Sequence, residues 1–153
     1  MKQSAAPTRV LWRSRIGGSL WLFVSCLMVG ALSAQTIRTV EKGAHSNLDD
    51  RLTAAAKTEP EWTALWKKHN FDKPAPAVDF SKEMVVAVFM GSRPTAGFSV
   101  EIVSAATRDG KVVVNYKEAQ PAPGGITAQV LTAPFHIAAI AKSSLPVTFE
   151  KQP

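Results

Sequence analysis

The most regular hydrophobic pattern in this chain of 153 residues is that of one amphipathic helix. The apolar face has the spacing i, i+3, i+4, i+7 and consists of Trp62, Leu65, Trp66 and His69. Thr58 and Glu61 have the spacing of a capping box, and Pro60 fits the first turn, where its missing N–H would be unpaired in any case. The pattern predicts a helix over residues 59–69, with both tryptophans on the core face.

The rest of the pattern is typical of strands. Residues 83–90 are apolar on both faces, which favours a central strand covered on both sides. Residues 98–102 alternate as in a half-buried strand, and Asp109-Gly110 is a hairpin turn signal. Further strands are predicted at residues 36–42, 111–117, 127–140 (one or two strands, with Pro134 at a bulge or edge) and around Val147 and Phe149. Residues 48–57 favour neither helix nor strand on their own.

Most of the connections between these strands have hairpin length. This favours an α+β fold, namely a mainly antiparallel, meander-like sheet with one packed amphipathic helix near residues 59–69. In a meander, alternate turns share an end, so the loops at 91–97 and 120–126 are expected to meet. Together with nearby positions they form a candidate binding surface: Arg93, Pro94, Thr95, Gly97, Phe98, Pro121, Pro123, Gly124, Gly125 and His136.

The first 34 residues have the pattern of a secretory signal peptide. Four basic residues are followed by an apolar run over residues 16–32 and by small residues up to Ala34. We expect residues 1–34 to be a cleaved signal peptide and residues 35–153 to form one domain. An uncleaved membrane anchor is the alternative, because about 17 apolar residues is also the lower limit for a span. Lipidation of Cys26 is less favoured, because the apolar run continues past it.

The net charge of +6 changes meaning once this segment is set aside. The remaining 119 residues carry 14 basic and 12 acidic side chains, a net charge of +2 without a basic stripe, which argues against nucleic-acid binding. The chain has a single cysteine, at position 26, so an intrachain disulfide framework or a cysteine metal site is excluded.

The chain lacks the usual catalytic motifs, and its histidines have no partners at metal-ligand spacing. We therefore expect no catalytic, cofactor or metal residues. His136 is either a half-buried residue bonded to backbone or the centre of a small-ligand or hydrolase-like site with Arg93 or Glu101. Glu101 and Glu118, on neighbouring predicted strands, fit a solvated sheet face better than an acid–base pair.

With these segments in place, the chain resembles the PrcB C-terminal domain family. The similar residues are Gly43-Ala44-His45-Ser46-Asn47, the helix Glu61 to His69, the segment Gly91 to Ile102 with its Pro-Thr-x-Gly-aromatic turn, Pro121-Ala122-Pro123-Gly124, Thr132-Ala133-Pro134-Phe135-His136 and Ile140-Ala141-Lys142. The resemblance is densest over residues 79–149. It favours an extended conformation for residues 51–56.

The resemblance implies an exported, non-catalytic accessory domain that binds another protein. The named family member accompanies a secreted bacterial protease complex, so a protease or another envelope protein is the implied partner. Membrane contact is expected only through residues 1–34, if they are uncleaved. The implied location is periplasmic or secreted, and less favoured is a membrane-anchored form.

Overall fold

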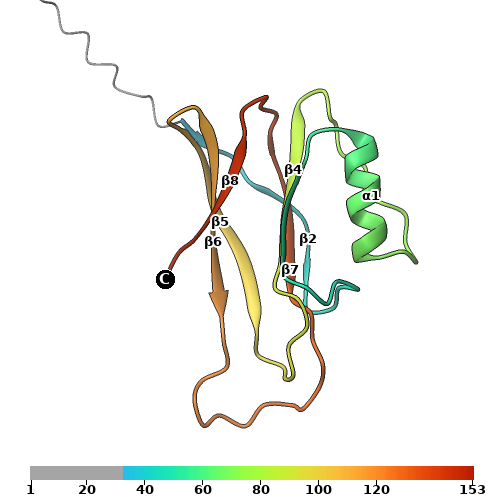
Figure 1. The fold of residues 1–153 in the computed structure, drawn as a ribbon, viewed down its shortest axis with the longest axis vertical. Helices are drawn as coiled ribbons and strands as arrows, with labels where there is room; N and C mark the ends of the chain where they lie inside the picture. Colours follow the sequence, from blue (N-terminus) through green and yellow to red (C-terminus); the bar gives the residue numbers. More distant parts are fainter. Residues whose placement is uncertain (1–32) are drawn as a thin grey trace, which may run out of the picture.

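Two four-stranded β-sheets face each other, and one helix covers the outside of the second sheet (Figure 1). This computed structural model describes residues 33–153. The first sheet has the order β1 (Ser33–Gln35), β5 (Ser99–Arg108), β6 (Lys111–Ala119), β8 (Val147–Lys151). The second has the order β2 (Arg38–Gly43), β7 (Phe135–Ala141), β4 (Glu83–Phe89), β3 (Leu52–Ala56). The helix α1 spans Glu59–His69.

The expected α+β class, mainly antiparallel with one packed helix, is confirmed, but the strands do not form a single meander. The β5–β6 hairpin is antiparallel, whereas β6 and β8 pair in parallel, with Val112 opposite Val147. The reason lies in β4, whose residues from Met84 to Phe89 are all fully buried. A strand that is apolar on both faces needs a cover on each side, and here α1 covers one face and the first sheet covers the other.

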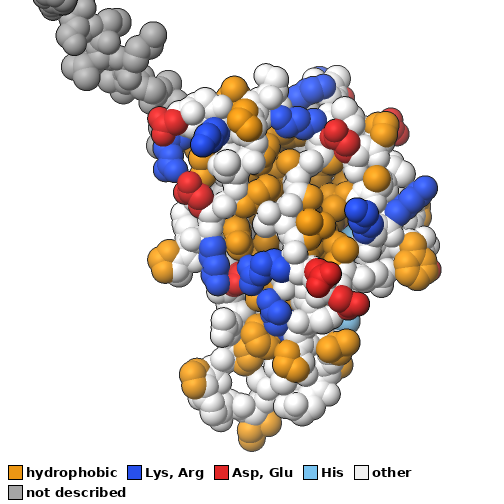
Figure 2. Space-filling model, viewed as in Figure 1, with side chains coloured by type: hydrophobic (Ala, Val, Ile, Leu, Met, Phe, Trp, Pro, Cys, Tyr) orange, Lys and Arg blue, Asp and Glu red, His pale blue; other side chains and the backbone are white. Residues whose placement is uncertain are grey.

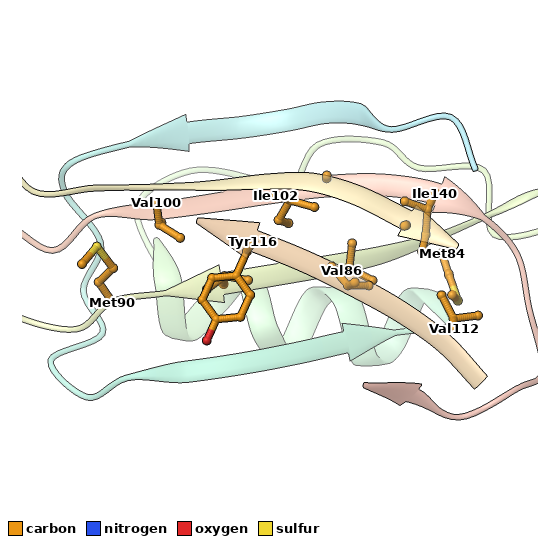
Figure 3. Close-up of a cluster of buried hydrophobic side chains, with 12 residues drawn as sticks. Met84, Val86, Met90, Val100, Ile102, Val112, Tyr116 and Ile140 are labelled. Carbon is orange, nitrogen blue, oxygen red and sulfur yellow. The ribbon is translucent and has the colours of Figure 1, made fainter. Parts of the chain in front are cut away.

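The core is accordingly split into two layers. Between the sheets, side chains from β4 and β7 meet side chains from β5 and β6; Figure 3 labels Met84, Val86, Met90, Val100, Ile102, Val112, Tyr116 and Ile140. Under the helix, Trp62, Leu65 and Trp66 pack on the other face of the second sheet. The indole N–H groups of Trp62 and Trp66 donate to the carbonyls of Pro76 and Lys73, so the proline-rich segment after the helix is held against it.

The helix begins and ends where the sequence predicts, but its capping differs. Thr58 is the N-cap residue, yet its side chain makes no capping hydrogen bond. Instead, the Glu61 carboxylate accepts a hydrogen bond of 2.7 Å from the backbone N–H of Lys57. Only the acidic half of the expected capping box is therefore formed, and it reaches one residue further back than the usual pattern.

Two strand predictions have different outcomes. Residues 52–56 form β3, paired with β4, as the family resemblance implied. The prediction of strand from residue 127 is wrong up to Pro134, because β7 begins only at Phe135 and Thr132 makes a single isolated bridge to Arg93. Residues 1–32 of the expected signal peptide (residues 1–34), and Cys26 with them, lie outside the described residues, whereas its last two residues, Ser33 and Ala34, belong to β1. Within the described part of the chain, no helix combines the length and apolar character needed to cross a membrane.

Candidate protein-binding surface

The two loops of the candidate surface lie side by side at one end of the sandwich, as expected (Figure 1). The backbones of Arg93 and Thr132 exchange two hydrogen bonds, of 2.6 and 2.9 Å, and the N–H of Ala96 donates to the carbonyl of Ala128. Gly97 has φ +90°, and a Cβ there would come within 3.1 Å of Pro121. The loop after β4 and the loop after β6 thus support each other.

Arg93 is held within this loop pair. Its guanidinium donates to the carbonyl of Ser92 (3.0 Å) and lies 5.9 Å from the ring centroid of Phe98, a cation–π arrangement. Both residues are half-buried. Thr95 and Pro121 are half-buried as well, whereas Pro94, Gly97, Pro123, Gly124 and Gly125 are exposed. Arg93 is therefore a partly accessible cation fixed on a rigid turn, able to receive a carboxylate or a carbonyl from outside.

Three apolar side chains complete the surface and are missing from the sequence prediction. Ile126 is fully exposed, Leu131 is 67% exposed and Val130 is 46% exposed. All three lie in a stretch, residues 119–141, that contains no Asp, Glu, Lys or Arg. Figure 2 shows this end of the molecule with hydrophobic side chains at its tip and charged ones only above it. The lack of charged residues between positions 119 and 141 is the sequence feature that could have indicated this exposed apolar loop. We call these residues with the two loops the loop surface.

A hollow of about 260 Å³ adjoins the loop surface. Its walls come from the segment after β2 and from both loops, and include Ser46, Asp49, Ser92 and Leu131. Asp49 accepts hydrogen bonds from the hydroxyl and the backbone N–H of Ser92, which fixes one wall. Arg93 does not line this hollow, so the structure does not join the cation and the hollow into one small-molecule site.

His136 is not part of the loop surface. It is 2% exposed, and its Nδ1 accepts a hydrogen bond of 2.8 Å from the backbone N–H of Ile102. The neutral ring therefore carries its proton on Nε2, which lies 3.0 Å from the hydroxyl of Thr39. Burial lowers the pKa of His136, and Lys42 lowers it further, against a weaker effect of Glu101. Both ring nitrogens are occupied, so the structure supports the backbone-bonded role rather than a reactive one.

The two carboxylates considered for acid–base chemistry are each paired with cations. Glu101 accepts a hydrogen bond of 2.9 Å from Lys42, and the hydrogen bond and charge of Lys42 lower the pKa of Glu101. Glu118 has a side chain only 2% exposed and is bound by both Arg51 and Lys151. Burial raises the pKa of Glu118, but the hydrogen bonds and charges of the two cations outweigh it and leave that pKa lowered. Glu101 therefore belongs to an exposed ion pair, as a solvated sheet face predicts, whereas that prediction is wrong for Glu118, which is a buried anion.

A second buried histidine, His69 at the end of α1, was expected only as a core-face residue. Its Nδ1 lies 2.9 Å from the hydroxyl of Ser46, and its Nε2 lies 3.5 Å from the Glu41 carboxylate without a hydrogen bond. Burial lowers the pKa of His69, although the facing Glu41 opposes this. Since the Ser46 hydroxyl also accepts from the N–H of Leu48, the cluster fastens the segment after β2 to the helix.

Neither a metal site nor a reactive cluster stands out in residues 33–153, where no group of three or more His, Cys, Asp or Glu side chains could hold a metal ion. The fold and surface define a two-sheet β domain with an outer helix and an exposed, uncharged loop surface. The PrcB C-terminal family model matches residues 84–141, from β4 through β7, and this segment is a PrcB C-terminal domain. No curated protein and no solved structure matches the chain.

Proposed function

We propose that this protein is an exported accessory domain that binds another protein through the loop surface. The observation that carries the proposal is the placement of Ile126, Val130 and Leu131 in solvent on a charge-free loop that is bonded to a second loop. Exposed apolar side chains gathered at one end of a domain are typical of protein-interaction sites. The bonded loops hold these side chains in place before binding, which reduces the entropy lost on association.

The family relationship supports the choice of partner. A PrcB C-terminal domain fits an accessory role beside a protease complex, and the structure holds His136 and Glu118 in structural contacts. The proposed partner is therefore a subunit of a secreted protease complex. The export expected from residues 1–34 would place both proteins in the same compartment.

Site-specific photocrosslinking tests this proposal in the cells that make the protein. A photoreactive phenylalanine analogue replaces Ile126 in the full chain, and a matched control carries it at Phe71, which is 72% exposed but lies just after α1, away from the loop surface. We expect a discrete crosslinked species from position 126 that contains a protease subunit, and none from position 71. The same species from both positions, or none from position 126, would contradict the proposal.

A further inference from the structure

The β5–β6 hairpin reverses direction through only two residues, Asp109 and Gly110, because Arg108 at the end of β5 pairs with Lys111 at the start of β6. Asp109 has φ 51° and Gly110 has φ 71°, and positive values at both central residues are typical of a type I′ turn. Among residues 33–153, Asp109 is the only residue other than glycine with a positive φ. An L-residue with a side chain rarely adopts this conformation, so the tight turn keeps Asp109 in an unfavourable backbone geometry.

The carboxylate of Asp109 is only weakly held. Its side chain is 88% exposed, and Oδ2 lies 3.9 Å from Nε of Arg108, whose guanidinium is bound more closely by Glu150, at 3.0 Å. An exposed ion pair at the longer distance contributes little. Asp79 shows the contrast, since its Oδ1 accepts hydrogen bonds from both the N–H and the hydroxyl of Ser81. The carboxyl group of Asp109 is therefore free to rotate toward the next residue.

The backbone nitrogen of Gly110 is accessible to that carboxyl group. It lies at the tip of the hairpin, and no backbone carbonyl in the described part of the chain accepts its N–H. Glycine has no side chain to shield the nitrogen, and the space that a Cβ would enter is open. No other aspartate or asparagine in the sequence is followed by glycine. An electrophilic carbon and an unshielded nucleophile thus stand side by side at this one place.

The two groups meet only when the turn opens, because the attack requires rotation about the backbone of Asp109. All four residues from Arg108 to Lys111 are exposed. Segments with few buried contacts open locally at a small cost in free energy. The unfavourable φ of Asp109 lowers this cost further, since opening releases it.

We propose that Asp109 is a site of spontaneous covalent modification, at which it converts to isoaspartate through a succinimide formed with Gly110. The Gly110 nitrogen attacks Cγ of the protonated Asp109 carboxyl group, the nitrogen loses its proton, and the carboxyl hydroxyl leaves as water. A water molecule then cleaves the ring between the main-chain carbonyl carbon of Asp109 and the nitrogen, so that the chain runs through Cγ. The water lost is regained, and no other reactant is needed.

The product places Cβ of Asp109 in the main chain, and a two-residue type I′ turn has no room for this extra atom. The closing pair of Arg108 with Lys111 would be lost first, and with it the 3.0 Å contact of Arg108 with Glu150 on β8. The turn and the loop surface lie at opposite ends of the sandwich (Figure 1). The modification therefore concerns the stability of the first sheet, and it goes beyond the proposed function and does not depend on it.

Incubation of the purified protein tests the proposal. The full chain is expressed, purified in the form that accumulates and kept at physiological temperature and neutral pH for several weeks. Peptides are then analysed by electron-transfer fragmentation, which distinguishes isoaspartate from aspartate. Asp72, followed by Lys73 in an exposed segment, is the internal control. We expect isoaspartate to accumulate at position 109 about tenfold faster than at position 72, because Lys73 has a side chain that shields its nitrogen.

Two variants complete the test. Gly110→Asn tolerates the positive φ but shields the nitrogen, and should slow the reaction at Asp109 about tenfold. Asp109→Gly keeps the turn but lacks the carboxyl group, so its melting temperature should stay constant during incubation, whereas the wild type should develop a second population that melts several degrees lower. If Gly110→Asn does not fold, the comparison with Asp72 still decides. Absence of isoaspartate at position 109, equal accumulation at position 72, or an undiminished rate in folded Gly110→Asn would overturn the proposal.

Discussion

The backbone N–H of Ile102 in β5 donates a hydrogen bond of 2.8 Å to Nδ1 of His136 in β7, and this bond joins the two sheets. It lies where β5 has a register shift between Ile102 and Ser104, so the N–H of Ile102 is free to leave the strand ladder. The imidazole thus takes the place of a missing strand neighbour. The residue that first suggests catalysis is part of the structure that closes the sandwich.

Removing this imidazole should destabilise the domain. In His136→Phe, the ring volume is largely kept but the buried N–H of Ile102 loses its acceptor, which costs about 1–3 kcal/mol of unfolding free energy. Urea denaturation followed by tryptophan fluorescence measures the change. His45→Phe serves as the control, because His45 is exposed and should tolerate substitution within about 0.5 kcal/mol. Equal stability of the two variants would contradict the structural role of His136.

The stability of the domain should fall as the pH drops below 7. Burial lowers the pKa of both His69 and His136 in the folded state, so the unfolded chain takes up protons first, near the ordinary histidine pKa of about 6.5. This stabilisation is fully present above that value and is lost as the pH falls through it, because protonation favours the unfolded chain. Melting temperatures from pH 8 to pH 5 should decrease in the wild type and decrease less in His136→Gln. A flat or rising profile would rule out this linkage.

Gly91 should be the least replaceable of the loop glycines. It has φ +75°, and an added Cβ would lie 2.5 Å from the carbonyl oxygen of Asp49, so both the backbone and the neighbouring chain resist a side chain. Gly91→Ala should cost about 3 kcal/mol or more, whereas Gly124→Ala, with the same φ but open space, should cost about 1–2 kcal/mol. Chemical denaturation of the two variants in parallel gives the difference. Equal costs would show that the contact with Asp49 is relieved by movement of the chain.

Breaking the cluster around Glu118 should have a moderate effect. Arg51→Gln removes a two-pronged partner of a carboxylate whose side chain is 2% exposed, but Lys151 remains 2.7 Å away. We expect a loss of about 1–2 kcal/mol, below the 3–5 kcal/mol of a fully buried pair, because both cations are half exposed. The control Arg108→Gln breaks only exposed pairs, with Glu150 and Asp109, and should cost less than about 1 kcal/mol. Equal losses in the two variants would mean that Glu118 is effectively solvated.

Local sequence pattern predicts the elements of this fold better than their partners. The spacing of Trp62 and Trp66 indicates the helix because periodicity is a property of a short segment. The two-sided burial of β4 implies two covering layers, but which strands form the covering sheet depends on pairings such as Val112 with Val147, far apart in the sequence. For the same reason the segment around His136 suggests a histidine bonded to backbone, but it does not reveal that the backbone belongs to Ile102.

In the candidate surface, too, local features could be predicted from the sequence and long-range contacts could not. Gly and Pro mark the two loops, since their backbone preferences are local, and the structure brings Gly97 against Pro121. Val130 and Leu131 lie in the segment 127–140 that the pattern predicts as strand, because an apolar side chain in an extended segment looks the same whether it faces the core or solvent. The clusters around Glu118 and His69 have no local pattern at all, since each assembles groups from three separate segments.

The parallel pairing of β6 with β8 sets the order in which this domain can fold. β8 contains the last strand residues of the chain, and β7, which joins β2 to β4, comes just before it. Neither sheet can be completed until these final segments are present, and topologies dominated by such distant pairings fold in roughly milliseconds to seconds rather than microseconds. The hydrophobic core between the two sheets therefore cannot be closed until the synthesis of the chain is almost finished.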